Sequence, residues 1–206
     1  MREQYGLAGL DAADLAGTPM AQFDDWFRSW AATEPYDANL ATLSTIGADG
    51  WPSARAVLVK GAEERGFVFF TNRNSAKGRA IDDIPRAALT FVWREIERQI
   101  RVVGTVELLP DDESDAYFAS RPRGAQIGAW ASDQSKVVGS RAELDVRYAE
   151  FDHRYPDEVP RPPHWGGYLI RPLTVEFWQG RPNRLHDRLE YRPSADGGWS
   201  IVRLAP

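Results

Sequence analysis

Short apolar runs separated by polar turns dominate the N-terminal half of the chain. Between residues 39 and 108 these turns, rich in Gly and charged residues, recur about every ten residues, which is typical of an antiparallel sheet or barrel. The runs predict five strands, at residues 39–46, 53–60, 67–71, 87–93 and 99–108.

A second group of apolar runs lies near the C-terminus. Residues 165–178 predict a pair of strands broken at Arg171-Pro172, and residues 185–192 and 199–204 predict a last hairpin. The whole pattern favours a fold that is mainly β with flanking helices, in the α+β class.

Four segments have helical features instead. Thr18-Pro19 predicts a helix start, and apolar residues then recur at three- and four-residue steps through about Ala32, as expected for a core-facing stripe. Other helices are expected from the 71–78 segment to about Asp83, over residues 111–120, and from Ser140 to about Tyr155. Residues 126–135 fit neither period and are expected to form a loop lining a site or a buried connector.

Length and composition narrow the class of protein. The 206 residues suit a single domain over 1–206, with residues 1–17 as a flexible lead-in. With 25 Lys+Arg against 30 Asp+Glu, the net charge is -5 and no basic block stands out, so no nucleic-acid partner is expected. No apolar run approaches membrane-spanning length, so no membrane partner is expected and the predicted location is cytoplasmic.

Two common kinds of site are not expected. The absence of cysteine excludes disulfides, thiolate catalysis and iron–sulfur clusters. The three histidines, His153, His164 and His186, do not pair at a spacing of four residues, so no metal site is expected.

Cations at the ends of predicted elements form the main candidate site. Each alone is an ordinary surface charge, but the set in an acidic chain predicts convergence on more than one phosphate. They are Arg55, Lys60, Lys77, Arg121, Arg184 and Arg188. His186 adds a titratable group between the last two, although a solvated basic hairpin also explains this stretch. Residues 71–78 could hold a phosphate at a helix start or simply cap that helix.

A series of short motifs in a fixed order identifies a relationship. The motifs are residues 55–60 (RAVLVK), 69–72 (FFTN), 97–99 (ERQ), 117–122 (YFASRP), 126–132 (QIGAWAS) with Gln134-Ser135, 165–168 (WGGY), 176–180 (EFWQG), 184–188 (RLHDR) and 203–206 (RLAP). Together they cover nearly the whole chain, and the chain resembles the pyridoxine/pyridoxamine 5'-phosphate oxidase family of flavoproteins.

The resemblance implies a split β-barrel and a homodimer with FMN bound where the subunits meet. The implied FMN contacts are Arg55, Ala56, Val57, Leu58, Phe70, Thr71, Lys77, Gln99, Gln134, Ser135, Trp178 and Arg188. The implied substrate contacts are Lys60, Tyr117, Arg121, Arg184 and His186, with Arg184 and His186 against the reacting ring and Arg2 and Tyr5 in an N-terminal lid.

The activity implied by the resemblance is the oxidation of pyridoxamine and pyridoxine 5'-phosphates to pyridoxal 5'-phosphate. Hydride passes from C4' to the flavin, O2 reoxidises the flavin to give H2O2, and the amine substrate also releases NH3. Two rival interpretations remain open: a related FMN oxidase acting on another ring, as in phenazine biosynthesis, and a non-catalytic flavin- or vitamer-binding protein.

Three positions depart from the family pattern. Ala76 stands where the family often has Arg, Ala125 where it usually has Ser, and Phe70 where Tyr is common. Arg73 and Arg79 are neighbours that could compensate for the missing arginine. Losing one neutral hydrogen bond should weaken binding by about two- to tenfold without abolishing it.

Overall fold

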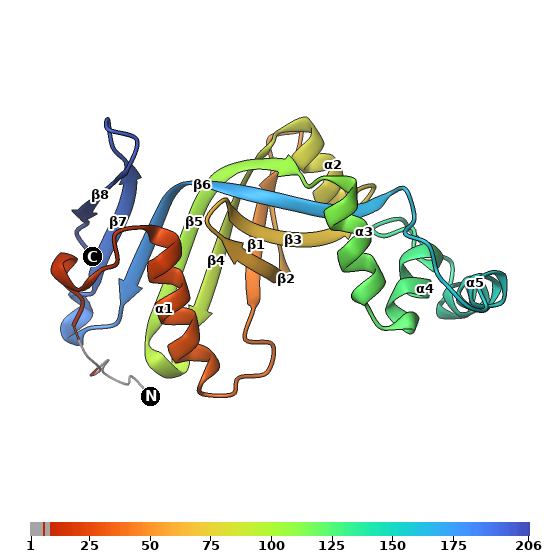
Figure 1. The fold of residues 1–206 in the computed structure, drawn as a ribbon, viewed down its shortest axis with the longest axis horizontal. Coiled ribbons are helices and arrows are strands. Elements are labelled where there is room, and N and C mark those ends of the chain that lie inside the picture. Colours follow the sequence, from red (N-terminus) through yellow and green to blue (C-terminus); the bar gives the residue numbers. More distant parts are fainter. Residues whose placement is uncertain (1–5, 7–8) are drawn as a thin grey trace.

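The structure is a computed structural model that describes residue 6 and residues 9–206. A barrel occupies the middle of an elongated molecule, with a group of helices at one end and a β-hairpin at the other (Figure 1). Among the residues described, no helix has both the length and the apolar character needed to cross a membrane.

Six antiparallel strands close into the barrel. They are β1 (Leu40–Ile46), β2 (Pro52–Glu63), β3 (Gly66–Asn72), β4 (Arg86–Trp93), β5 (Arg98–Leu108) and β6 (Trp165–Gln179). They follow the order β3-β2-β1-β4-β5-β6, and pairing of β3 with β6 closes the ring. The predicted mainly β class with flanking helices and the split β-barrel are confirmed, although β2 is longer than the expected strand.

The predicted break at Arg171-Pro172 is wrong, because β6 is one continuous strand. On one edge, β6 pairs with β3 as far as Ile170 and with β7 only from Val175, so Pro172 has a neighbouring strand, β5, on its other edge alone. A proline, which has no N–H to donate, is tolerated at a position of this kind. The irregularity is a bulge in β6: Val103 and Gly104 of β5 face Thr174 and Pro172, so Leu173 is an extra residue directly after the proline. A Cβ at Gly104 would lie 2.2 Å from the carbonyl oxygen of Arg171, so only glycine fits this crossing.

The barrel core is aromatic and is covered by helix α1 (Pro19–Ala31). The predicted helix start is confirmed, since Thr18 Oγ1 accepts a hydrogen bond from the Ala21 N–H at 3.2 Å. Phe23 and Trp26 are buried and pack edge-on against Phe67 and Phe177. The stripe is therefore core, as its spacing predicted.

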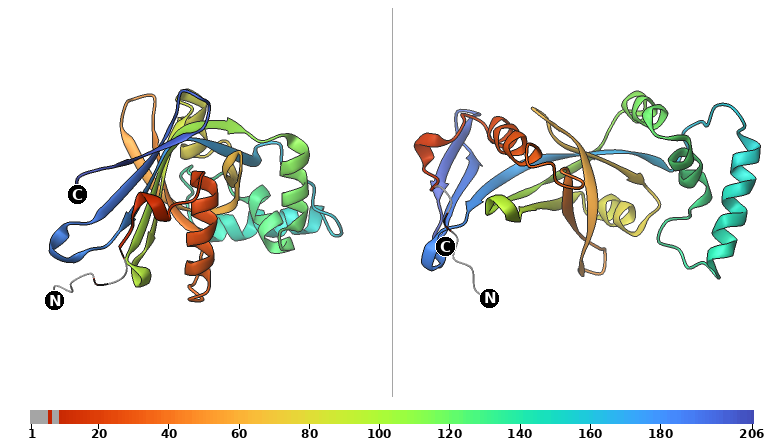
Figure 2. Two further views of the ribbon diagram at one scale, coloured as in Figure 1. Left: turned by 60° about the vertical axis from the view of Figure 1, so that its left-hand side comes forward. Right: turned by 90° about the horizontal axis from the view of Figure 1, so that it is seen from below.

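The remaining helices are α2 (Ala76–Asp83), α3 (Asp111–Ser120), α4 (Arg123–Ala131) and α5 (Arg141–Arg154). Helices α3, α4 and α5 extend from one end of the barrel (Figure 2). The prediction that residues 126–135 lack a regular period is wrong for residues 126–131, which are helical. Ile127 and Ala131 are buried one turn apart, so tertiary packing gives this small-residue segment its apolar face.

The opposite end is formed by β7 (Asp187–Pro193) and β8 (Trp199–Arg203), which extend the sheet from β6. Residues 9–17, which the sequence assigns to a flexible lead-in, pack on this hairpin. Leu10 is buried there, and its N–H donates to Asp187 Oδ2 at 3.1 Å. The hydroxyl of Tyr191 donates to the Ala16 carbonyl at 2.7 Å. These contacts fix residues 9–17 to the C-terminal end of the chain.

Candidate functional site

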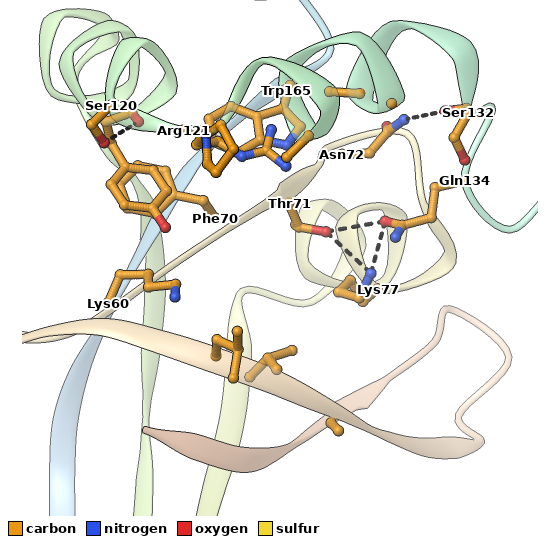
Figure 3. Close-up of a pocket in the computed structure, with 18 residues that line it drawn as sticks. Lys60, Phe70, Thr71, Asn72, Lys77, Ser120, Arg121, Ser132, Gln134 and Trp165 are labelled. Atoms are coloured by element: carbon orange, nitrogen blue, oxygen red, sulfur yellow. Dashed lines mark hydrogen bonds between the residues drawn. The ribbon is translucent and has the colours of Figure 1, made fainter. Parts of the chain in front are cut away.

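A cavity of about 870 Å³ opens between strands β2 and β3 and helices α2, α3 and α4. Ten of the predicted contact residues line it: Ala56, Val57, Leu58, Lys60, Phe70, Thr71, Lys77, Tyr117, Arg121 and Gln134. Lys60 and Arg121 lie toward one end, and Lys77, Thr71 and Gln134 lie together at the other (Figure 3). The fold thus brings cations from separate segments to the two ends of one cavity.

Lys77 is held by neutral oxygens at its end of the cavity. Its Nζ donates to Thr71 Oγ1 at 3.1 Å, Gln134 Oε1 at 3.0 Å and Ser75 Oγ at 3.3 Å. Burial, together with the charge of Arg55, lowers the pKa of Lys77 to about 8. An ammonium whose charge is destabilised in this way is suited to bind an anion.

Arg55 does not line the cavity, but its positive charge affects Lys77 at this end. Its guanidinium donates to the Leu43 carbonyl at 3.2 Å and to Thr45 Oγ1 at 2.8 Å, and it also bonds Ser53 Oγ. Burial lowers its pKa. Arg55 is therefore a fixed positive charge close enough to affect Lys77.

Neither Arg73 nor Arg79 replaces the arginine absent at Ala76. Arg79 bonds the Asn74 carbonyl, and Arg73 lies beside Asp111 with Nη2 and Oδ1 3.8 Å apart. Neither arginine belongs to the lining of the cavity. Among the described residues, the cations that act on this end are therefore Lys77 and Arg55. Ala125, the other departure from the family pattern, does line the cavity.

Arg121 dominates the other end. Its guanidinium carbon lies 4.7 Å from the centre of a Trp165 ring and 5.6 Å from that of Phe118. Its Nη1 is buried with no hydrogen-bond partner among the residues described. Burial lowers the pKa of Arg121. A desolvated cation with an unused donor is expected to bind an anion.

Parallel aromatic rings lie beside Arg121. The ring centroids of Phe70 and Tyr117 are 3.9 Å apart, and that of Trp165 lies 5.5 Å from that of Phe70. Phe70 was predicted to contact FMN and Tyr117 to contact substrate. Burial raises the pKa of Tyr117, so its hydroxyl remains a neutral donor at neutral pH.

The other predicted contacts lie away from this cavity within one chain. Gln99, Trp178 and Arg188 form one row across β5, β6 and β7, as direct cross-strand partners. Arg184 and His186 precede β7 in the same hairpin, whereas Ser135 is an exposed residue beside Gln134. Arg2 and Tyr5 lie outside the described residues.

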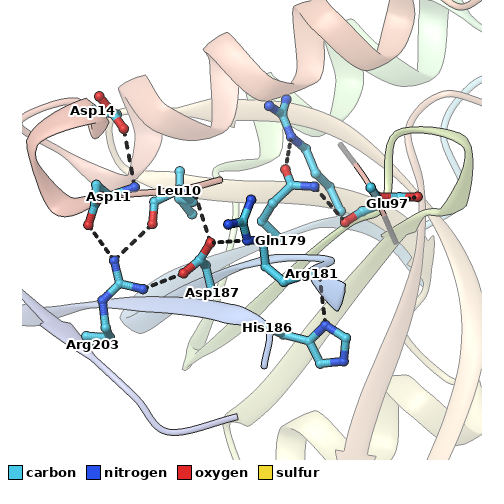
Figure 4. A network of polar contacts seen from close by, with 11 residues as sticks. Leu10, Asp11, Asp14, Glu97, Gln179, Arg181, His186, Asp187 and Arg203 are labelled. Carbon is cyan, nitrogen blue, oxygen red and sulfur yellow. Dashed lines mark hydrogen bonds and ion pairs between the residues drawn. The ribbon is translucent and has the colours of Figure 1, made fainter. Parts of the chain in front are cut away.

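The hairpin holds its histidine in a defined state. His186 Nδ1 accepts from the Arg181 N–H at 3.1 Å (Figure 4), so the neutral ring carries its proton on Nε2. The His186 ring lies 4.5 Å from that of Trp178. The exposed Arg184 follows Asn183, and both adopt left-handed φ angles, 62° and 58°. Strained turns of this kind occur often at ligand sites.

The chain matches the models of two known protein families. Residues 31–155 match the family described as pyridoxamine 5'-phosphate oxidase. The chain belongs to this family. Residues 165–206 match the pyridoxine 5'-phosphate oxidase C-terminal dimerisation region, which includes β6, β7 and β8.

Curated relatives resemble the chain over its full length. The pyridoxine/pyridoxamine 5'-phosphate oxidase of Burkholderia multivorans is 58% identical over 208 residues, covering 100% of this chain and 97% of that protein. The protein of the same name from Cupriavidus pinatubonensis is 53% identical with the same coverage.

Solved structures share the fold. PhzG from Burkholderia lata, in complex with tetrahydrophenazine-1-carboxylic acid, has a TM-score of 0.91 at 27% identity and covers 99% of this chain and 100% of its own. A pyridoxamine 5'-phosphate oxidase-related, FMN-binding protein from Nostoc punctiforme has a TM-score of 0.74 at 18% identity, over 93% of this chain and 100% of its own.

Several residues of the lining were not predicted as contacts. Asn72 donates to the Ser132 carbonyl at 3.3 Å, and Gly128 and Ala129 present the face of α4. Trp165 supports Arg121, as described above. All belong to the motifs that carry the family resemblance, but motif membership alone does not separate lining residues from packing residues.

Proposed function

We propose that the chain is an FMN-dependent oxidase that converts pyridoxamine and pyridoxine 5'-phosphates to pyridoxal 5'-phosphate in vitamin B6 metabolism. O2 is the final acceptor and H2O2 a product, with NH3 released from the amine. The single observation that carries the proposal is one cavity with separate cationic ends, Lys77 with Arg55 and Arg121 with Lys60. Two phosphorylated ligands, cofactor and substrate, account for two such ends.

The residues fit FMN. A phosphate would receive charge-assisted hydrogen bonds from Lys77 and the hydroxyl of Thr71, in the positive field of Arg55 and beside the start of α2. When bound, FMN would accept the hydride from C4' of the substrate and return the electrons to O2. Lys60, Tyr117 and Arg121 would hold the substrate phosphate and so fix the position of C4'.

A homodimer would complete the site. One face of the sheet carries small side chains in a continuous row, Ala54, Ser44, Ala88, Val103 and Thr174, each beside the next. Val103 and the nearby Val92 are 45% and 63% exposed. A partly apolar face of this kind suits self-association, and a twofold axis would carry the hairpin of one copy to the cavity of the other.

The roles of the hairpin follow from its chemistry. Arg184 would place a permanent positive charge, and His186 an Nε2 donor, against the substrate ring. Both would orient the ring.

A related oxidase acting on an unphosphorylated ring is the second candidate, supported by the similarity to PhzG and by Ala125 in the lining. The paired cations Lys60 and Arg121 favour a dianionic phosphate. Arg121→Ala should therefore raise KM for the phosphorylated vitamers by about 100-fold. The matched control is Arg79→Ala, outside the cavity, and intact turnover in Arg121→Ala would favour the second candidate.

The decisive test uses the FMN-loaded protein with each vitamer phosphate. We expect anaerobic bleaching of the flavin by both substrates, and oxygen uptake with aldehyde formation in air. Flavin that binds but is not reduced by either substrate would indicate a non-catalytic binding protein and overturn the proposal.

A further inference from the structure

A buried carboxylate, Glu176, lies beside the row formed by Gln99, Trp178 and Arg188, two residues from Trp178 along β6. Glu176 is 4% exposed, although it points to the outer face of the sheet beside the exposed Arg101. Arg188 Nε and Nη2 donate to its two carboxylate oxygens at 2.8 and 3.0 Å, and Arg101 Nη1 donates at 3.1 Å. One negative charge thus lies between two guanidinium groups.

These contacts fix the direction of Arg188. Its remaining nitrogen, Nη1, donates to the Ala205 carbonyl at 2.8 Å. A guanidinium has five N–H groups, so these three bonds leave one N–H on each terminal nitrogen. Arg188 can therefore offer a ligand only one edge, and Glu176 determines which edge that is.

The neighbours of Arg188 indicate what that edge contacts. Gln99, Trp178 and Arg188 place an amide, an indole and a guanidinium side by side in one row. Such a row suits the polar edge of a flat heteroaromatic ring, whereas the phosphate donors are at the ends of the cavity. Under the proposed function, on which this inference rests, that ring is the flavin.

We propose that Glu176 is a positioning residue that orients Arg188 and sets the net charge beside the flavin ring. The Arg101–Glu176–Arg188 cluster carries one net positive charge, and a flavin gains negative charge when it is reduced. Removal of Glu176 makes the surroundings more positive and favours reduced flavin, whereas removal of Arg101 has the opposite effect.

The test compares Glu176→Gln with Arg101→Met in the FMN-loaded protein, by redox titration and FMN titration. The flavin midpoint potential should rise in the first variant and fall in the second, and the FMN dissociation constant should increase about tenfold in Glu176→Gln but less than twofold in Arg101→Met. Glu107→Gln is the matched control, since Glu107 pairs with Arg171 on the same strands and both are about half exposed.

The outcomes separate the two proposals. Opposite shifts of potential support the inference, because a purely structural defect would not reverse sign between the variants. Identical potentials in all three variants, or shifts in one direction only, overturn it while leaving the proposed function intact. Failure of the wild-type chain to bind FMN overturns both. Arg101 is 49% exposed, so its variant remains informative if Glu176→Gln does not fold.

Discussion

The cavity and the C-terminal hairpin both carry cations, but they stabilise them differently. In the cavity, Lys77 is held by neutral oxygens and Arg121 lies against aromatic rings. In the hairpin, Arg188 pairs with Glu176, and Arg203 pairs with Asp187 and Asp11. Lys77 and Arg121 therefore leave their positive charge available to a ligand, whereas Arg188 and Arg203 are paired with carboxylates.

This difference indicates separate tasks. Cations without carboxylate partners are compensated by an anionic ligand, so the cavity is suited to bind an anion. Ion pairs with defined geometry restrict side-chain directions, so the hairpin is built to orient. Helices α3 and α4, which line the cavity, and the β7–β8 hairpin lie at opposite ends of the barrel in one chain (Figure 2), and the proposed homodimer would combine the two regions.

The largest expected effect tests that combination. Arg121→Ala impairs the cavity and Arg184→Asn the hairpin, and each homodimer should have almost no activity. A doubly tagged dimer with one variant in each chain should recover about half of the wild-type activity, because twofold symmetry leaves one of the two sites intact. Oxygen uptake by the purified mixed dimer measures this.

The matched control places both substitutions in one chain and pairs it with a wild-type chain. Shared sites predict no recovery, because each of the two sites then contains one substitution. Half activity in this control, with none in the mixed dimer, would mean that each site lies within one chain.

The second effect contrasts the closure of the barrel, where β3 meets β6, with the turn of the hairpin. Gly66 has a φ of 137°, and a Cβ there would lie 2.1 Å from the Ile170 carbonyl oxygen where β3 closes on β6. Gly66→Ala should lower the free energy of unfolding by about 3 kcal/mol or more. Gly197 lies in the hairpin turn, with a φ of 86° and open space around it. Gly197→Ala should therefore lower the free energy of unfolding by only about 1 kcal/mol. Urea denaturation of both variants tests the contrast, and equal losses would contradict it.

The third effect is a pH dependence confined to the cavity. Under the proposed function, an FMN phosphate would bind the charged form of Lys77, whose pKa in the free protein is about 8, so FMN affinity should fall about tenfold between pH 7 and pH 9. Flavin fluorescence titration measures this. Lys77→Met should bind more weakly with a flatter profile, and an unchanged slope in that variant would exclude Lys77 as the cause.

The same lowered pKa affects stability in the opposite direction. Between pH 8 and the ordinary value of 10.5, the unfolded chain binds the Lys77 proton more tightly than the folded chain does. This residue should therefore make the ligand-free protein more stable as the pH rises through that window. Comparison of wild type with Lys77→Met isolates its contribution.

The smallest effect concerns the lead-in on the hairpin. Asp11 is 80% exposed in its pair with Arg203, so Asp11→Asn should change the free energy of unfolding by less than about 1 kcal/mol. It should nevertheless increase proteolysis within residues 9–17, because Arg203 also donates to the Leu10 carbonyl at 3.0 Å and holds this segment. Limited proteolysis followed by mass spectrometry tests this, and unchanged cleavage would show that Leu10 burial alone holds the segment.

The local sequence was sufficient for most elements. Turn residues at regular intervals predicted the barrel strands, and Thr18-Pro19 predicted the start of α1, because these signals act over a few residues. It failed at α4 and at Pro172. Both features depend on partners distant in the sequence. Helix α4 forms where packing buries Ile127, and Pro172 is tolerated where the strand paired with β6 changes from β3 to β7.

For the site, the sequence determined the chemistry and the tertiary structure decided its distribution. Residue types and motif order predicted two groups of cations and the family, since charge and hydrogen-bonding capacity belong to the side chains themselves. Barrel closure and the long β6 strand decided that Lys77 and Arg121 share one cavity while Arg184 and Arg188 lie on a distant hairpin. Distance in space depends on contacts between segments far apart in the chain, which no single stretch of sequence contains.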